Sequence, residues 1–151
     1  MNCKCGNKPL RGKDVCLACF TKQDSDTQRA KPKHIEDAIQ EAFFNTARMI
    51  FPKLGKLLFA VPNGGKRDKR EAERMKKQGV VPGVSDIICL VPNKEYKFLC
   101  LETKTETNDQ SDHQIQFQKE VEIVGGLYIV FRSAAEGIEL LTKYLKTTKY
   151  K

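Results

Sequence analysis

The residues best suited to chemistry lie in a stretch whose pattern predicts a β-hairpin. Two apolar, β-prone runs, residues 82–91 and 98–104, flank a polar turn, which is the pattern of an antiparallel hairpin with a longer loop. Because both runs are apolar on both faces, they are expected in the middle of a covered sheet. The runs nevertheless contain Asp86, Glu102 and Lys104, and a buried charge is costly unless it is paired or binds a metal.

Strand geometry indicates what these three side chains could do. Glu102 and Lys104 are two residues apart and therefore share one face of a strand. If Asp86 lies across from Glu102, the patch holds two carboxylates and an ammonium group. Such a patch suits a hard divalent cation such as Mg²⁺, with a lysine that orients water or stabilises charge on a phosphorane. The alternative is a salt-bridged strand end, in which Lys104 neutralises Glu102 and Asp86 is a turn residue.

The segments around the triad are more specific than the triad itself. They occur in this order: Val-Pro-Asn-Gly-Gly-Lys-Arg at 61–67, Pro-Gly-Val-Ser-Asp at 82–86, Glu-Thr-Lys at 102–104 and Ser-Asp-His-Gln at 111–114. In order, spacing and flanking glycines, the chain resembles the VRR-NUC family of the PD-(D/E)xK nuclease superfamily over residues 35–145. One position departs from the superfamily pattern, since Ser85 stands where a proline is usual; that proline is not a ligand.

The resemblance implies a restriction-endonuclease-like α/β core, with a central mixed β-sheet flanked by helices. It implies a metal-dependent endonuclease that hydrolyses phosphodiester bonds in branched or Holliday-junction-like DNA. It also implies a homodimer, whose two sites would suit a symmetric junction. A phage or bacterial source is implied as well, with the protein in the cytoplasm of the bacterial cell or the phage-infected host.

The same resemblance implies roles for individual residues. Asp86, Glu102 and the backbone carbonyl of Thr103 would bind Mg²⁺ or Mn²⁺. Lys104 would orient the attacking water or stabilise the pentavalent phosphate.

Two further residues have a role in the resemblance and a structural alternative. Glu36, one helical turn before Gln40, would support the metal; equally, it is an ordinary first-turn glutamate favoured by the helix dipole. Gln114 would position Lys104 or the substrate, and as the partner of Ser111 in a capping box it also has a sufficient structural role.

The cysteines predict a second metal. Four of the six cysteines lie near the N-terminus in a C-x-C…C-x-x-C arrangement: Cys3, Cys5, Cys16 and Cys19. Four thiolates fit a tetrahedral Zn²⁺ site, and four protein ligands leave no open position, so the zinc is expected to be structural. Cys89 and Cys100 are expected to pack as small apolar residues.

The predicted organisation is a zinc-binding module with four cysteines at 1–21, a linker at 22–32, a nuclease-like domain at 33–146 and a basic tail at 147–151. Periodicity and capping patterns predict helices at 33–51, 66–78, 111–124 and 133–145, and strands at 57–61 and 127–131 beside the hairpin. Ser133 and Glu136 form a second predicted capping box, at the start of the last helix. This order of elements is typical of an α/β architecture with helices on both faces of a mixed sheet.

The charge of the chain indicates its partners. A net charge of +8 over 151 residues favours polyanions, and nucleic acid is the first candidate. The expected DNA contacts lie in the Asn-Gly-Gly turn at 63–65 and in the basic helix predicted after it: Asn63, Lys66, Arg67, Lys69, Arg70 and Arg74. The alternative is a solvated helix, because acidic residues are interleaved. No apolar run reaches the ~18 residues that span a bilayer and the N-terminus has no signal-peptide pattern, so a soluble, intracellular protein with no membrane partner is expected.

A rival function is a non-catalytic, zinc-containing nucleic-acid-binding protein, in which the cysteine module and the basic helix bind and the triad is only a salt bridge. Binding alone needs no buried carboxylates, since these repel phosphate. The complete set of Asp86, Glu102 and Lys104 therefore favours the nuclease.

Overall fold

The computed structural model describes residues 32–62 and 69–148, with the backbone alone described for Pro32, Lys33 and Lys69. The four cysteines of the predicted zinc site lie outside these residues, as do three of the predicted DNA contacts: Asn63, Lys66 and Arg67. The chain divides into two compact units, Met1–Ile35 and Glu36–Lys151. The described residues are the second unit without residues 63–68 and 149–151, together with residues 32–35 of the first unit.

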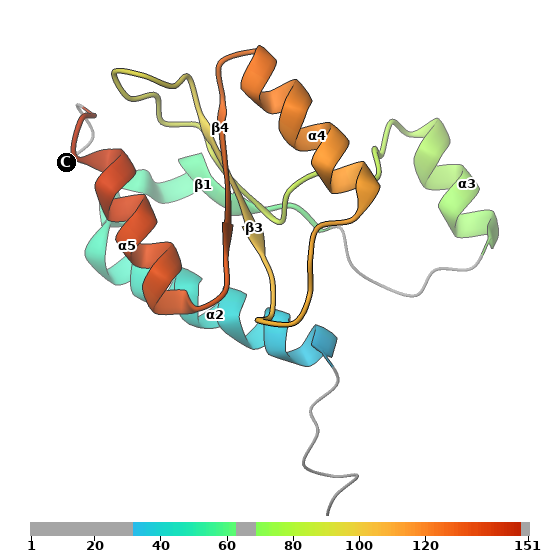
Figure 1. The fold of residues 1–151 in the computed structure, drawn as a ribbon, viewed down its shortest axis with the longest axis horizontal. Coiled ribbons are helices and arrows are strands. Elements are labelled where there is room, and N and C mark those ends of the chain that lie inside the picture. Colours follow the sequence, from blue (N-terminus) through green and yellow to red (C-terminus); the bar gives the residue numbers. More distant parts are fainter. Residues whose placement is uncertain (1–31, 63–68, 149–151) are drawn as a thin grey trace, which may run out of the picture. The chain divides into compact units, whose positions relative to one another are not determined.

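The elements follow one another in the order α2 (Pro32–Ile50), η1 (Pro52–Leu57), β1 (Leu58–Ala60), α3 (Lys69–Lys77), β2 (Ile87–Cys89), β3 (Leu99–Thr103), α4 (Asp112–Ile123), β4 (Leu127–Phe131) and α5 (Ala134–Leu145) (Figure 1). The four strands form one sheet in the order β1-β2-β3-β4. The first two pairings are antiparallel and the β3–β4 pairing is parallel. The predicted mixed sheet is confirmed.

Helices cover both faces of the sheet (Figure 1). On one face, Phe43 of α2 and Leu141 of α5 pack with Leu101 of β3 in the larger core. On the other face, Val121 of α4 packs with Cys100 of β3 in a smaller core. Successive residues of β3 therefore point to opposite cores, as expected for a strand with both faces covered.

The predicted hairpin is present as the central pair of strands, β2 and β3. Every residue of β3 is buried. The connecting loop is fixed by Asn93, whose Oδ1 accepts hydrogen bonds from the backbone N–H groups of Glu95 (2.8 Å) and Tyr96 (2.7 Å). This asparagine-centred turn lets the chain reverse direction without a two-residue glycine turn.

The first predicted strand is shorter than expected. The strand predicted at 57–61 is reduced to β1 because the 3₁₀ helix η1 precedes it, and Gly55 within η1 has a positive φ of 50°. The basic helix predicted from residue 66 is described only from Lys69. Its end is as predicted: the N–H of Gly79 (φ 88°) donates to Lys76 and that of Val80 to Met75, which is the Schellman arrangement.

The two predicted capping boxes differ in outcome. The box that opens α4 is complete, because Ser111 Oγ accepts from the N–H of Gln114 and Gln114 Oε1 accepts from the N–H of Ser111. The box that opens α5 is half formed. Ser133 Oγ accepts from the N–H of Glu136 at 3.2 Å, but Glu136 Oε2 accepts from the N–H of Arg132 at 2.7 Å. The carboxylate therefore reaches one residue further back than predicted.

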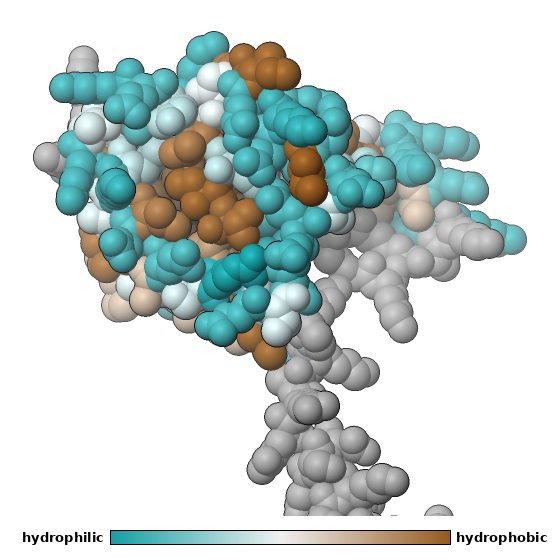
Figure 2. Space-filling model, viewed as in Figure 1, coloured by the Kyte–Doolittle hydropathy of each residue, from teal (hydrophilic) through white to brown (hydrophobic). Residues whose placement is uncertain are grey.

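Strand β4 forms one edge of the sheet, and apolar side chains gather over it between α4 and α5 (Figure 2). A surface hollow of about 520 Å³ lies here, and its lining includes Leu127, Ile129 and Leu140. In the part of the chain that the structure describes, no helix has the length and apolar character needed to cross a bilayer.

Candidate active site

The register of the central hairpin places the two key carboxylates side by side. Ile87 pairs with Leu101, and one further step of the same register pairs Asp86 with Glu102. Because side chains alternate along a strand, both carboxylates lie on the α4 face. Asp86 Oδ2 accepts a hydrogen bond of 3.0 Å from the N–H of Thr103. The arrangement on which the metal hypothesis depended is therefore present.

A glycine lets the segment before Asp86 approach helix α4 closely. Gly83 has a positive φ of 82°, and a Cβ at this position would lie 2.5 Å from the carbonyl carbon and oxygen of His113. Any other residue would combine a strained backbone with a backbone clash. This close approach explains why the motif before Asp86 has a glycine at residue 83. The side chain of His113 is exposed.

Glu102 is held by three donors. Its side chain is 1% exposed, and its Oε1 lies 3.0 Å from Lys104 Nζ. The same oxygen accepts a hydrogen bond from Gln114 Nε2, while Oε2 accepts one of 3.1 Å from the hydroxyl of Tyr128. Strands β3 and β4 and helix α4 therefore all position this one carboxylate.

Burial and mutual repulsion dominate the electrostatics of the two carboxylates. Burial, followed by the charge of Asp86, raises the pKa of Glu102 to about 7, although Lys104 opposes the shift. Burial also raises the pKa of Asp86, against the hydrogen bond from Thr103 and the charge of Lys104. The single positive charge of Lys104 does not neutralise both Asp86 and Glu102 when they are ionised in this buried patch. A bound cation would therefore be stabilised here.

The donor set fits a hard divalent cation that keeps part of its water shell. Asp86 Oδ1 accepts no hydrogen bond from the described residues. Because the N–H of Thr103 faces Asp86, its carbonyl in the same strand lies on that side too. The residues that the structure describes contain no group of three or more His, Cys, Asp or Glu side chains arranged for a metal. Mg²⁺ is commonly held by one or two carboxylates plus water, so two carboxylates and a carbonyl are a suitable set.

Glu36 lies at the border of this site and holds the loop that follows Lys104. Its Oε1 accepts from the N–H of Thr105 at 3.4 Å and from Asn108 Nδ2 at 3.2 Å. Its charge also contributes to raising the pKa of Asp86. Gln40, one turn along the helix, instead lines a groove beside β1. Of the predicted Glu-x-x-x-Gln pair, Glu36 therefore contacts the loop after Lys104, whereas Gln40 lies in the groove beside β1.

Gln114 combines two contacts through different atoms. Its Oε1 completes the capping box with the N–H of Ser111 at 2.8 Å, and its Nε2 donates to Glu102. The sequence suggested Lys104 or substrate as its partner, whereas the structure places it against the carboxylate with which Lys104 pairs.

Two residues at this site were missed by the sequence analysis. Tyr128 donates to Glu102, and Arg132 donates through Nη1 to the carbonyl oxygens of Thr105 and Asn108, the latter at 2.8 Å. A tyrosine in an otherwise apolar strand was a usable signal, because a buried hydroxyl needs a partner. Arg132 carried no comparable signal, since its partners are backbone carbonyls.

Of the predicted DNA contacts within the described residues, Arg70 and Arg74 are exposed on α3. They lie one turn apart and so share a face of the helix. The side chain of Lys69 lies outside the described part of the chain.

Cys89 and Cys100 are buried free thiols, as predicted.

Changing Tyr128 to phenylalanine would remove the hydroxyl and keep the ring that packs against Phe117. We expect divalent-metal affinity to fall roughly ten- to a hundredfold, as for other partners of metal-binding carboxylates. Tyr144→Phe is the matched control, because Tyr144 is equally buried and donates to the carbonyl of Val91 in the core on the opposite face. Calorimetry with Mn²⁺ and the melting temperature should separate the two variants. If both variants lost the same amount of metal affinity, the role of Tyr128 would be packing alone.

A mixed sheet covered by helices, with two carboxylates and a lysine at its centre, defines a restriction-endonuclease-like α/β core. A solved VRR_NUC domain protein has the same fold: the TM-score is 0.68 at 20% sequence identity, covering 82% of this chain and 95% of that one. No family model matches the sequence, and neither does any curated protein. The fold implied by the sequence motifs is confirmed, because the chain has the fold of that VRR_NUC domain protein.

Proposed function

We propose that the chain is a metal-dependent endonuclease of the VRR-NUC family that hydrolyses phosphodiester bonds in DNA. The observation that carries the proposal is the placement of Asp86 opposite Glu102, with Lys104 Nζ 3.0 Å from Glu102 Oε1. The likeness to a VRR_NUC domain protein supports it, and so does the net charge of +8. This arrangement supplies acidic metal ligands and a cationic group within one buried patch.

Asp86, Glu102 and the Thr103 carbonyl would hold Mg²⁺ or Mn²⁺. When bound, such an ion neutralises phosphate charge and lowers the pKa of a coordinated water. Lys104 would orient the attacking water or stabilise the negative charge that develops on the phosphate oxygens. Glu36 contributes indirectly by fixing the loop after Lys104, and Gln114 by fixing Glu102.

The salt-bridge alternative can be tested directly, because Lys104 does pair with Glu102. A pair that served stability alone would not need a second carboxylate beside it, since Asp86 raises the pKa of Glu102 and weakens that pair. Cleavage of four-way junction, flap, duplex and single-stranded DNA should be measured with Mg²⁺ and with EDTA. Mg²⁺-dependent cutting of branched DNA is expected, and its absence on all four substrates would reject the proposal.

We also propose a homodimer, in which two sites act on a symmetric branched substrate. The apolar surface over β4 supports a partner of this kind (Figure 2). The N–H of Leu127 donates to Phe98 and the N–H of Lys104 to the carbonyl of Phe131. By alternation, the backbone groups of Tyr128 and Val130 face the open edge. Two copies of this edge can pair antiparallel about a two-fold axis.

Helix α3 is proposed to contact the phosphate backbone. Changing Arg70 and Arg74 to alanine should weaken DNA binding and reduce the slope of log affinity against log salt by about 0.9 for each phosphate that is no longer neutralised. The protein should stay folded, because both side chains are exposed. Lys56→Ala, which removes an exposed charge on η1, is the control and should leave the slope unchanged. An unchanged slope in the double variant would identify α3 as a solvated helix.

A structural zinc ion is proposed for Cys3, Cys5, Cys16 and Cys19, which lie outside the described residues. Purified protein should contain one zinc per chain, because paired cysteines at this spacing supply a complete tetrahedral ligand set. Atomic emission analysis and thiol titration measure zinc content and free thiols. Four reactive N-terminal thiols without zinc would contradict the assignment. Since four protein ligands leave no open position, zinc removal is expected to spare the metal site at Asp86.

A further inference from the structure

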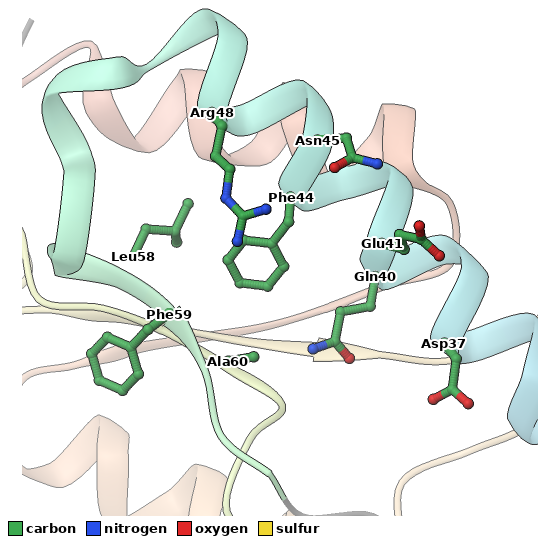
Figure 3. Close-up of a pocket in the computed structure, with 9 residues that line it drawn as sticks. All are labelled: Asp37, Gln40, Glu41, Phe44, Asn45, Arg48, Leu58, Phe59 and Ala60. Carbon is green, nitrogen blue, oxygen red and sulfur yellow. The ribbon is translucent and has the colours of Figure 1, made fainter.

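A groove of about 480 Å³ lies between helix α2 and the edge strand β1 (Figure 3). Three side chains at four-residue spacing project from the helix toward the strand: Gln40, Phe44 and Arg48. The neighbouring row of the helix lines the rim with acidic and amide groups: Asp37, Glu41 and Asn45. The groove thus has an inner wall with amide, aromatic and guanidinium groups and an outer rim that carries negative charge.

The inner wall contains a layered platform. Phe44 is 9% exposed, and the guanidinium carbon of Arg48 lies 5.4 Å from the centroid of its ring. Arg48 itself is exposed. A guanidinium plane supported from behind by an aromatic ring is a good surface for stacking another flat group.

The strand side of the groove offers backbone hydrogen-bonding groups. The N–H of Val61 donates to Asp86 O at 2.7 Å, and the carbonyl of Leu57 accepts from Leu90. Because antiparallel bonding alternates, the N–H and C=O groups of Leu58 and Ala60 point away from β2. Within the described residues, no other strand pairs with this edge of the sheet. The groove therefore faces an edge that has both donors and acceptors.

The groove begins beside the catalytic carboxylates. The residue one turn before Gln40 is Glu36, which bonds to the loop after Lys104, and a helical turn advances only ~5.4 Å. On the opposite wall, the residue after Ala60 is hydrogen-bonded to the carbonyl of Asp86. A nucleotide next to a phosphate held at the carboxylates would lie at the mouth of this groove.

We propose that the groove between α2 and β1 binds an unpaired nucleobase, that of a nucleotide in the cut strand close to the scissile phosphate. Arg48 stacks on the flat face of the base, while Gln40 and the edge of β1 hydrogen-bond its polar edge. The acidic rim formed by Asp37 and Glu41 repels phosphate and accepts hydrogen bonds from exocyclic amino groups. This inference rests on the proposed nuclease function and deepens it, because it selects DNA with an unpaired nucleotide near the cut site.

The test scans an abasic residue through the single-stranded arm and branch point of a flap substrate. Binding is measured in the Asp86→Ala background, so that the readout does not depend on cleavage. We expect one position at which loss of the base weakens binding roughly tenfold, in the range found for base stacking. Arg48→Ala and Gln40→Ala should weaken binding of the intact flap by a similar factor, with little further loss on the abasic flap. Arg48→Lys keeps the charge but loses the plane, so it should behave like Arg48→Ala.

Two outcomes would overturn the inference while leaving the nuclease proposal intact. One is equal binding of all the abasic substrates. The other is a loss in Arg48→Ala that is the same for intact and abasic flaps, which would indicate a general phosphate contact. Failure to bind any DNA would overturn both the base-binding groove and the nuclease proposal.

Discussion

Replacing Asp86 with alanine is expected to abolish Mg²⁺-dependent DNA cleavage in a protein that remains folded and still binds DNA. Asp86 is the proposed ligand with an oxygen not engaged by the described residues. Because a bound metal supplies several kcal/mol of transition-state stabilisation, loss of the ligand should reduce the cleavage rate by about a thousandfold or more. Removal of a carboxylate also removes charge that repels phosphate, so DNA affinity should stay level or rise.

Glu139→Ala provides the control for loss of a carboxylate, because Glu139 is exposed on α5. It should cut DNA at the wild-type rate. Cleavage, DNA affinity and melting temperature should be measured for both proteins on the same branched substrate. If Asp86→Ala folds and cuts at the wild-type rate, Asp86 is not a catalytic ligand. If it loses stability without a selective loss of activity, the salt-bridge interpretation is the better one.

The position of the central hairpin could be predicted because its signals are local. Apolar runs on both sides of a polar turn predicted β2 and β3, and alternation along the strand predicted that Glu102 and Lys104 share a face. The sequence left open whether Asp86 pairs with Glu102, since this depends on how many residues the loop between the two strands contains. In the structure, the side chain of Asn93 closes this loop by accepting two hydrogen bonds from backbone N–H groups.

The network around Glu102 could not be predicted because it is built from long-range contacts. Tyr128 reaches Glu102 only because β4 lies parallel beside β3 with Glu102 paired to Val130. The capping role of Gln114 is local and was predicted correctly. Its bond to Glu102 depends instead on the packing of α4 over the sheet, which periodicity does not reveal.

Some details at the ends of the elements were also outside the reach of sequence patterns. The first helix was expected to end at residue 51, just before Pro52. Helix α2 does end at Ile50, but the chain then continues as the 3₁₀ helix η1. A 3₁₀ turn after an α-helix needs only a few favourable residues, so it leaves little trace in composition. Likewise the carboxylate of Glu136 accepts from the N–H of Arg132 rather than from the N–H of Ser133. This shift of one residue depends on the local path of the chain.

Affinity for Mn²⁺ should rise about tenfold for each pH unit between pH 5 and pH 7. Burial and the charge of Asp86 raise the pKa of Glu102 to about 7, so the carboxyl group is protonated below that pH. A metal binds only the ionised form and therefore displaces one proton for each ion bound. Calorimetry in buffers with different ionisation enthalpies measures both the affinity and the number of protons released. A metal affinity that is flat over this range would contradict a protonated Glu102.

The stability of the metal-free protein should change with pH in the opposite direction. The pKa of Glu102 is raised from 4.5 in the unfolded chain to about 7 in the fold, so between these values the folded state holds the proton more tightly. This contribution to stability is fully present below pH 4.5 and is lost as the pH rises through 7, at up to ~1.4 kcal/mol per pH unit. Glu102→Gln cannot ionise and should lack this slope. The comparison of wild type and variant by urea unfolding in EDTA removes the contributions of other carboxylates. Equal slopes in the two proteins would show that Glu102 ionises at its ordinary pKa and that the buried patch does not hold its proton.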